Sequence, residues 1–294
     1  MFTRVDRVQL AVPDRAEAAK GWQHILGAEH HADERVACLG AVRASLRLGN
    51  GWVELLEPDG AGPVADAVAA RGGHLYAGGM ATPDVGALAA RLADQGVDAP
   101  AEHGQLFLDT EHTGGRGLRL VVSAEDDLPA VGAIDQFYEI TNLVGDHETA
   151  VKGYVDLFGF APDAFQPIKS DEYGYEGTLT LLDDARLDRF EVITPTAPDK
   201  TMGRYFSKFG DSLYMCFAET GAITEIEARC VETNAPHTRV PSREQRPETA
   251  DTVFLHPGAL GGMMLGLSRR SVAWSWSGHP DRVENWRQPE GTSS

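Results

Sequence analysis

A repeated sequence pattern constrains the fold of this chain more than any other feature. The segment Gly72-Gly73-His74-Leu75-Tyr76 recurs as Gly210-Asp211-Ser212-Leu213-Tyr214. Three further segments recur in the same order: Val5-Asp6-Arg7 as Ile134-Asp135-Gln136, Glu54-Leu55-Leu56-Glu57-Pro58 as Glu191-Val192-Ile193-Thr194-Pro195, and Gly114-Gly115 as Gly261-Gly262. Similar segments in a fixed order indicate duplicated structural units.

Hydrophobic periodicity divides the chain into four modules, each with a strand, a helix and further strands. In the first module a strand over 5–12 leads to a helix that Asp14 caps and Gly27 ends, followed by strands around 36–38, 44–48 and 52–56. A polar loop over 235–250 precedes the final strands. One module alone would leave an apolar sheet face open, whereas two paired modules close a curved sheet around a cavity.

The sequence therefore predicts an α+β protein of four βαβββ modules, paired into two tandem domains, 1–124 and 130–270. The acidic, Pro-bearing segment 125–129 is the predicted linker. The tail, 271–294, is rich in tryptophan, and we expect these large apolar side chains to pack on the body of the protein or on a partner.

The composition narrows the class of partner. A formal net charge of −18 argues against nucleic acids and anionic membranes, because both are bound through basic surfaces. No stretch has the length of a membrane span, and the three cysteines lack metal-motif spacing and are typical of reduced core thiols. We therefore expect a cytoplasmic protein that acts on a small organic molecule; a homodimer stays open.

Two segments resemble a known family. Residues 5–14, with a helix closing at Leu26-Gly27, resemble the opening of the vicinal oxygen chelate superfamily. That superfamily includes glyoxalase I, methylmalonyl-CoA epimerase, extradiol dioxygenases and bleomycin-resistance proteins. His256-Pro257 with Gly261-Gly262 resembles the run before its last strand, so the resemblance covers about residues 3–270. It implies glyoxalase-like domains and a divalent metal held by His, Gln or Glu from the first and last strands of paired modules.

Carried over to the N-terminal half, the resemblance places Arg7, Glu54, Arg119 and either Tyr76 or Ala77 at the ligand positions. Arginine is permanently charged and has no lone pair for a metal, so this set contradicts a metal there. We expect Arg7, Glu54 and Arg119 to form a buried ion network instead.

In the C-terminal half the same positions hold Gln136, Glu191, Tyr214 and Gly266. Two good ligands are too few for a tight transition-metal site. The resemblance thus predicts no cofactor; a divalent metal, if one is bound, would be held by Gln136, Glu191 and His256.

The remaining groups favour proton transfer in the C-terminal cavity. Glu191 is the predicted base, Tyr214 the acid or oxyanion partner, and Gln136 a third catalytic residue. The predicted substrate-binding residues are Tyr173, Tyr175, Phe206 and His256.

Such chemistry is typical of an isomerase, an epimerase or a lyase. A non-catalytic small-molecule binding or resistance protein is the alternative, in which Glu191 and Tyr214 are structural remnants. A metal-dependent glyoxalase or extradiol dioxygenase is less favoured, because the dioxygenase ligands His, His and Glu are not provided.

Overall fold

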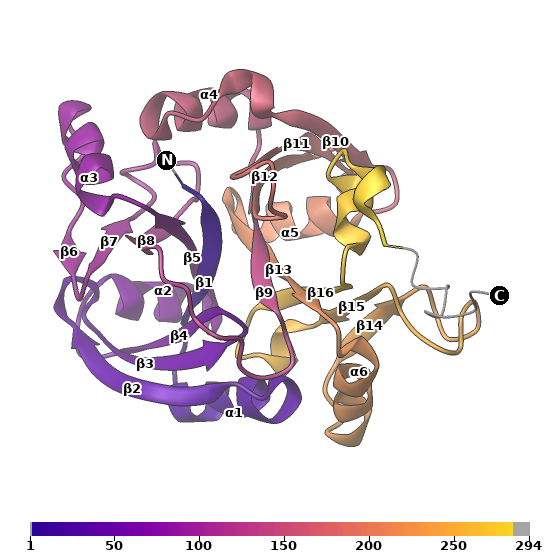
Figure 1. The fold of residues 1–294 in the computed structure, drawn as a ribbon. Coiled ribbons are helices and arrows are strands. Elements are labelled where there is room, and N and C mark those ends of the chain that lie inside the picture. Colours follow the sequence, from indigo (N-terminus) through magenta and orange to yellow (C-terminus); the bar gives the residue numbers. More distant parts are fainter. Residues whose placement is uncertain (1, 285–294) are drawn as a thin grey trace.

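The computed structural model describes residues 2–284 and contains two curved eight-stranded sheets that lie side by side (Figure 1). The first sheet is formed by residues 4–124 and the second by residues 136–269. The predicted α+β fold of paired modules is confirmed. Trp286 of the predicted tail lies outside the described residues.

The first sheet has the strand order β2-β3-β4-β1-β5-β8-β7-β6. Its strands are β1 (Arg4–Ala11), β2 (Glu29–Val36), β3 (Ala41–Leu48), β4 (Gly51–Pro58), β5 (His74–Thr82), β6 (Ala101–Glu102), β7 (Gln105–Leu108) and β8 (Leu120–Ala124). Its helices are α1 (Arg15–Leu26), α2 (Pro63–Arg71), α3 (Val85–Asp94) and the 3-10 turn η1 (Ala37–Leu39). Strands β1 and β5 pair antiparallel at the centre, so each side of the sheet is one module.

The second sheet has the matching order β10-β11-β12-β9-β13-β16-β15-β14. Its strands are β9 (Gln136–Leu143), β10 (Gln166–Ser170), β11 (Tyr175–Leu181), β12 (Arg189–Pro195), β13 (Ser212–Thr220), β14 (His237–Val240), β15 (Thr252–Leu255) and β16 (Met264–Arg269). Its helices are α4 (His147–Phe158), α5 (Thr201–Phe209) and α6 (Ile223–Glu232), with 3-10 turns η2 (Pro162–Ala164), η3 (Pro257–Ala259), η4 (Val272–Trp276) and η5 (Pro280–Arg282).

The first helix of each half begins at an aspartate cap and ends at a glycine; the Asp14 cap was predicted, whereas the Asp146 cap was not. The Asp14 carboxylate accepts a hydrogen bond from the Glu17 amide at 2.9 Å, and Asp146 does the same for Thr149 at 3.0 Å. Such N-caps satisfy an amide that has no partner within the helix. Gly27 and Gly159 end α1 and α4 at φ of 73° and 77°, in the left-handed region that glycine adopts without strain.

The strands missed by the sequence prediction lie at the edges of the sheets. β2 covers residues 29–36, where a strand at 36–38 was predicted, and β14 lies within the predicted polar loop. Most residues of β2 are exposed or half-buried, and its sequence is largely polar. An edge strand with little buried surface does not need apolar alternation, so it resembles a loop in sequence.

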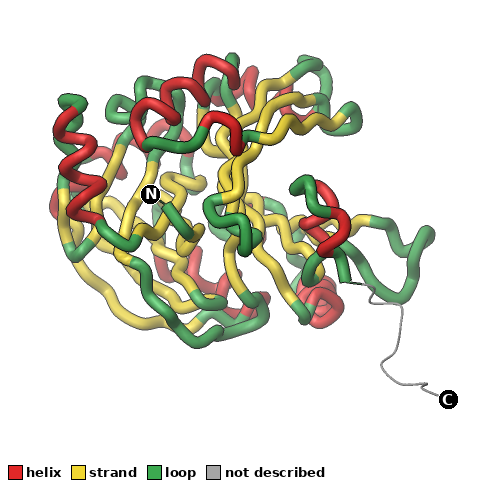
Figure 2. The backbone as a smooth tube through the Cα atoms, turned by 45° about the horizontal axis from the view of Figure 1, so that its top comes forward, coloured by secondary structure: helices red, strands yellow, loops and turns green. Residues whose placement is uncertain are grey.

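The helices flank the two sheets (Figure 2). Apolar side chains of α1, α3, α4 and α6 pack with those of the strands in one core that extends through both halves. Trp22 on α1 and Tyr154 on α4 are both fully buried in it. Among residues 2–284, no helix combines the length and the apolar character needed to cross a bilayer.

Two glycines, Gly262 and Gly117, lie where the two halves meet. A Cβ atom on Gly262 would lie 2.0 Å from the carbonyl oxygen of Gly73, and one on Gly117 would lie 2.0 Å from that of Asp211. The same backbone approach is therefore made twice, in opposite directions. Strand pairing makes Gly117 the counterpart of Gly262, two residues after the predicted Gly115.

The register of the first strand also differs from the sequence match. Arg7 on β1 lies beside Trp52, and Glu139 on β9 lies beside Arg189. Trp52 and Arg189 each stand two residues before the glutamate of their strand. The counterpart of Arg7 is therefore Glu139, and the prediction that matched Arg7 with Gln136 is wrong by three residues.

Candidate active site

The two sheets enclose cavities of very different size. The cavity of the C-terminal sheet measures about 760 Å³, whereas the one in the N-terminal sheet measures about 60 Å³. Ligand sites commonly have volumes of about 300–1,000 Å³. The C-terminal cavity therefore has the size of a small-molecule site.

The space inside the N-terminal sheet is filled by a buried polar network. Arg7 donates to Glu54 at 2.8 Å, as predicted. Gln9 and Gln105 each donate to the same carboxylate at 2.7 Å. Arg43 contacts both Gln105 and Glu54. With five side chains joined in this way, the carboxylate has no free position toward a ligand.

Arg119 does not join that network, which corrects the prediction. Its guanidinium carbon lies 4.8 Å from the centroid of the Tyr76 ring, a cation–π contact.

Five of the seven predicted site residues line the C-terminal cavity: Glu191, Tyr214, Tyr173, Tyr175 and His256. They come from β12, β13, the turn before β11, β11 itself and the residue after β15. Gln136 and Phe206 are not among its lining residues.

The shifted register of β9 explains the position of Gln136. Successive side chains of a strand point to opposite faces, so a shift by three residues exchanges the faces. Glu139 and Thr141 therefore line the cavity, and Gln136 lies at the start of the strand beside Glu219. Glu139 occupies the place that was predicted for Gln136.

Phe206 lies on α5 and packs against an apolar cluster that includes the cavity-lining residues Met202 and Tyr214. A Cβ atom on Gly145 would lie 3.2 Å from its ring, so the ring fills space beside the loop before α4. Its predicted contact with substrate is replaced by this packing role.

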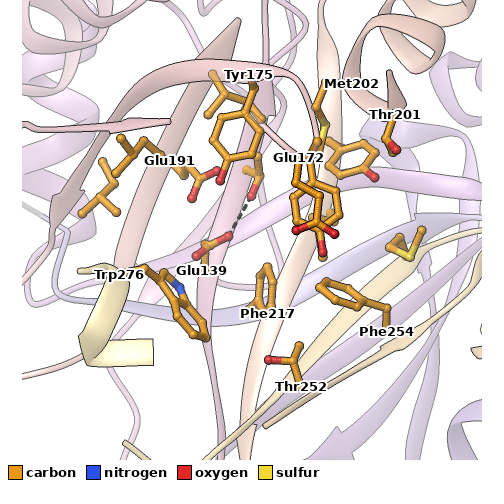
Figure 3. A pocket seen from close by; sticks show the side chains of 18 of the residues that line it. Glu139, Glu172, Tyr175, Glu191, Thr201, Met202, Phe217, Thr252, Phe254 and Trp276 are labelled. Carbon is orange, nitrogen blue, oxygen red and sulfur yellow. Dashed lines mark hydrogen bonds between the residues drawn. The ribbon is translucent and has the colours of Figure 1, made fainter. Parts of the chain in front are cut away.

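Glu191 is the most perturbed acid of the cavity. Burial raises the pKa of its carboxyl well above its usual range, the charge of Glu139 raises it further, and Arg189 partly opposes both. Burial likewise raises the pKa of the Tyr175 phenol, with Glu191 as the next contributor. The Tyr175 ring points toward the Glu191 carboxyl (Figure 3). Glu191 thus keeps its proton at pH values where an ordinary glutamate has lost it.

Arg189 is fully buried beneath the C-terminal segment. Its Nε donates to Glu139 at 2.6 Å, and its Nη1 contacts the Ser277 hydroxyl and the Ala273 carbonyl. The Trp276 ring centroid lies 5.8 Å from its guanidinium carbon. The described part of the tail therefore packs on the body, as predicted, and closes one side of the cavity.

Tyr214 lies in a group of phenols away from Glu191. Its ring contacts the edge of Tyr205, with centroids 4.8 Å apart. Burial raises its pKa to about 12, with further contributions from Tyr205 and Tyr173. The Tyr214 phenol is therefore neutral at physiological pH and can donate a hydrogen bond into the cavity.

His256 follows β15 at the cavity wall. Its Nε2 lies 2.9 Å from the Thr238 hydroxyl oxygen. Burial lowers its pKa, and His237 lowers it further, so the ring is neutral at pH 7. His256 is therefore suited to hydrogen bonding with a polar group and not to supplying a positive charge.

The donors in this cavity do not fit the metal that the resemblance implies. Glu139 is paired with Arg189, and a Cβ atom on Gly266 would lie 2.3 Å from the Phe217 ring, which fills that place. Within the described range, 2–284, no three His, Cys, Asp or Glu side chains are grouped as metal ligands. Glu191 is left without the imidazole partners of a transition-metal centre.

Sequence reasoning missed Glu139 and Arg189, although both carried a signal. Arg189 stands two residues before Glu191, and side chains at that spacing share one face of a strand. Glu139 is a charged residue in an otherwise apolar or neutral strand. A buried charge needs a partner of opposite charge, so the two residues could have been predicted to form an ion pair with each other.

Residues 6–109 match the family model described as the Glyoxalase/Bleomycin resistance protein/Dioxygenase superfamily. This match lies within the N-terminal half and confirms the resemblance for that part of the chain. No curated protein matches the chain significantly.

Two solved structures share the fold over most of this chain. A mutant of 4-hydroxymandelate synthase from Streptomyces coelicolor is 14% identical with a TM-score of 0.66, covering 98% of this chain and 99% of its own. A xylose isomerase-like TIM barrel/4-hydroxyphenylpyruvate dioxygenase fusion protein is 15% identical with a TM-score of 0.62, covering 92% of this chain and 49% of its own. Methylmalonyl-CoA epimerase from Mycobacterium tuberculosis is 14% identical with a TM-score of 0.39, over 47% of this chain and 89% of its own.

Proposed function

We propose that this chain, whose N-terminal domain belongs to the glyoxalase, bleomycin-resistance and dioxygenase superfamily, is an enzyme that moves a proton next to a carbonyl group in its C-terminal cavity. An isomerase, an epimerase or a lyase performs such a step. The observation that carries the proposal is Glu191, an acid of raised pKa facing a cavity of about 760 Å³.

Glu191 serves as the base. A carboxylate whose conjugate acid has a raised pKa is a stronger base than an ordinary glutamate. Its pKa is also closer to neutral pH, where a general base is most effective. Among residues 2–284 the Glu191 carboxyl has no hydrogen-bond partner, so it is free to approach a substrate carbon. No metal is needed for this step in the proposal.

Neutral phenols stabilise the oxygen on which charge develops. Tyr175 is the phenol that faces Glu191, and Tyr214 extends the same wall farther from it. A hydrogen bond to an enolate oxygen is strongest when the donor is already in place. We therefore propose that Tyr175 is the main hydrogen-bond donor to the enolate oxygen, the role that was predicted for Tyr214.

Hydrogen exchange in D₂O tests the proposal without knowledge of the natural substrate. The protein is incubated with a set of aryl-substituted ketones, and deuterium uptake beside the carbonyl is followed by NMR. We expect Glu191→Gln to slow catalysed exchange by about 10²–10⁴-fold. Glu176→Gln, an exposed neighbour on β11, is the matched control and should exchange at the wild-type rate. Equal exchange by wild-type protein and Glu191→Gln would contradict the assignment.

The second candidate is a protein that binds a planar compound without changing it. The aromatic walls of the cavity favour this function: Tyr173, Tyr175, Tyr214, Phe217, Phe254 and Trp276. Native mass spectrometry separates the two candidates. A retained compound that is released unchanged after long incubation supports binding, and a compound that is converted supports catalysis.

A further inference from the structure

We propose that the C-terminal cavity takes a planar aromatic ligand that carries no negative charge, and that Trp276 of the C-terminal segment is the residue that holds its ring. This inference rests on the proposed function of the cavity and names the class of molecule that enters it. It follows from how the charges and rings of the wall are arranged.

The strongest cation of the cavity wall, Arg189, is already paired. It is buried from solvent, bonded to Glu139 and covered by residues of the C-terminal segment. The ion pair is neutral as a whole. A guanidinium that is already paired with a buried carboxylate is a weaker receptor for the carboxylate or phosphate of a ligand than an unpaired one.

The remaining charges also disfavour an anion. Lys169 and Glu172 both line the cavity, are exposed at its mouth, and carry opposite charges. Exposed charges are screened by solvent and contribute little. An anionic ligand deeper in the cavity would lie beside Glu191 and Glu139, and the arginine there is already paired with Glu139, so the ligand's charge would lose solvation without gaining an unpaired cation.

The shape and chemistry of the wall favour a flat ring. Trp276 projects from η4 toward the cavity, opposite Phe217 and near Glu139 (Figure 3). It is 37% exposed, although it is a large apolar side chain. A ring that stacks on this indole would cover it, and ring–ring contacts add to the free energy of simple burial. The neutral phenols of the cavity wall suit a neutral acceptor such as a ketone oxygen.

A pair of probes of equal shape tests the charge rule. 2-Acetylnaphthalene and 2-naphthoate share the same rings. The first carries a neutral ketone where the second carries a carboxylate. By calorimetry we expect the ketone to bind wild-type protein at least about tenfold more tightly. Equal affinity, or tighter binding of the naphthoate, would overturn the inference.

The Glu139→Gln variant shows whether the charges of the wall cause this preference. It leaves Arg189 without its carboxylate, so naphthoate should gain affinity and the ratio should fall by about tenfold or more. An unchanged ratio in a variant that keeps the wild-type circular dichroism spectrum would mean that simple hydrophobicity sets the preference, and the charge argument would be wrong.

Trp276 is tested with the same ketone. We expect Trp276→Ala to weaken binding by about tenfold, and Trp276→Phe to recover most of the loss. Wild-type affinity in Trp276→Ala would remove this residue from the site. Calorimetry reads binding alone, so failure of these experiments is distinct from failure of deuterium exchange with Glu191→Gln.

Discussion

Arg189, Glu139 and Glu191 act as one electrostatic group at the floor of the C-terminal cavity. The guanidinium neutralises Glu139, and both influence the proton affinity of Glu191. A change at any one of the three therefore alters the other two. For this reason their contributions have to be measured in combination.

The Arg189→Met variant leaves the Glu139 carboxylate buried without a cation. We expect the free energy of unfolding to fall by about 3–5 kcal/mol, measured by urea denaturation. The double variant Glu139→Gln with Arg189→Met removes both charges and should recover much of the loss. Equal losses in the single and double variants would show that packing of Arg189, rather than its charge, is what stabilises the site.

The raised pKa of Glu191 fixes the direction of the pH dependence. A base acts as its carboxylate, so exchange should be slow at low pH and rise as Glu191 loses its proton. Because its pKa lies well above the usual value of 4.5, the rise should fall at a pH clearly above that value. The measurement is the rate of deuterium uptake against pH, and a rate already at its plateau near pH 5 would contradict a raised pKa.

The close contact between the loops of the two halves depends on glycines, because a side chain there would collide with the opposite backbone. Gly115 and Gly117 form a matched pair, because their φ angles are 75° and 67° and they stand two residues apart. A Cβ atom on Gly115 would meet nothing within 4 Å, whereas one on Gly117 would lie 2.0 Å from the Asp211 carbonyl oxygen.

We expect Gly115→Ala to lower the free energy of unfolding by about 1–2 kcal/mol, the cost of a left-handed backbone for alanine. Gly117→Ala should lower it by a further 1–3 kcal/mol or so, because the two halves must move apart. Thermal denaturation measures both. If both variants lost the same free energy of unfolding, the close contact at Gly117 would be relieved by a local shift that costs no stability.

The elements also show which parts of the fold were readable in the sequence. The central strands and the capped helices were predictable, because β1, β5, α1 and α4 combine buried apolar residues with local caps. The register of β9 was not, because register is set by neighbouring strands and not by the strand's own residues. This is why Glu191 was found as a site residue while Gln136 was named in place of Glu139.

The whole molecule is held together by polar contacts between the halves as well as by the shared core. The Val5 amide on β1 donates to the Asp188 carboxylate at 2.8 Å, and Asp188 is 1% exposed. Burial raises the pKa of Asp188 to about 6, although the hydrogen bond from Val5 opposes this. Asp188 directly precedes Arg189, so the junction of the halves adjoins the floor of the cavity.

The folded protein therefore binds the Asp188 proton more tightly than the unfolded chain, whose carboxyl has the ordinary value of 3.8. Stability from this group is present below pH 4 and is lost as the pH rises to about 6. Relative to Asp188→Asn, the wild-type protein should lose up to about 3 kcal/mol of unfolding free energy over that interval. Parallel curves of stability against pH for the two proteins would refute the shift.

The reciprocal glycine contact has the symmetry of an isologous dimer interface, in which the same surface of each partner meets the other. Two separate chains with such an interface associate according to their concentration, whereas tethered halves stay together at any dilution. In a homodimer every substitution appears in both subunits. Here each half has its own sequence, so a substitution can change one half alone. The protein thus resembles a tethered heterodimer: the N-terminal half has a cavity of only about 60 Å³, whereas the C-terminal half has one of about 760 Å³.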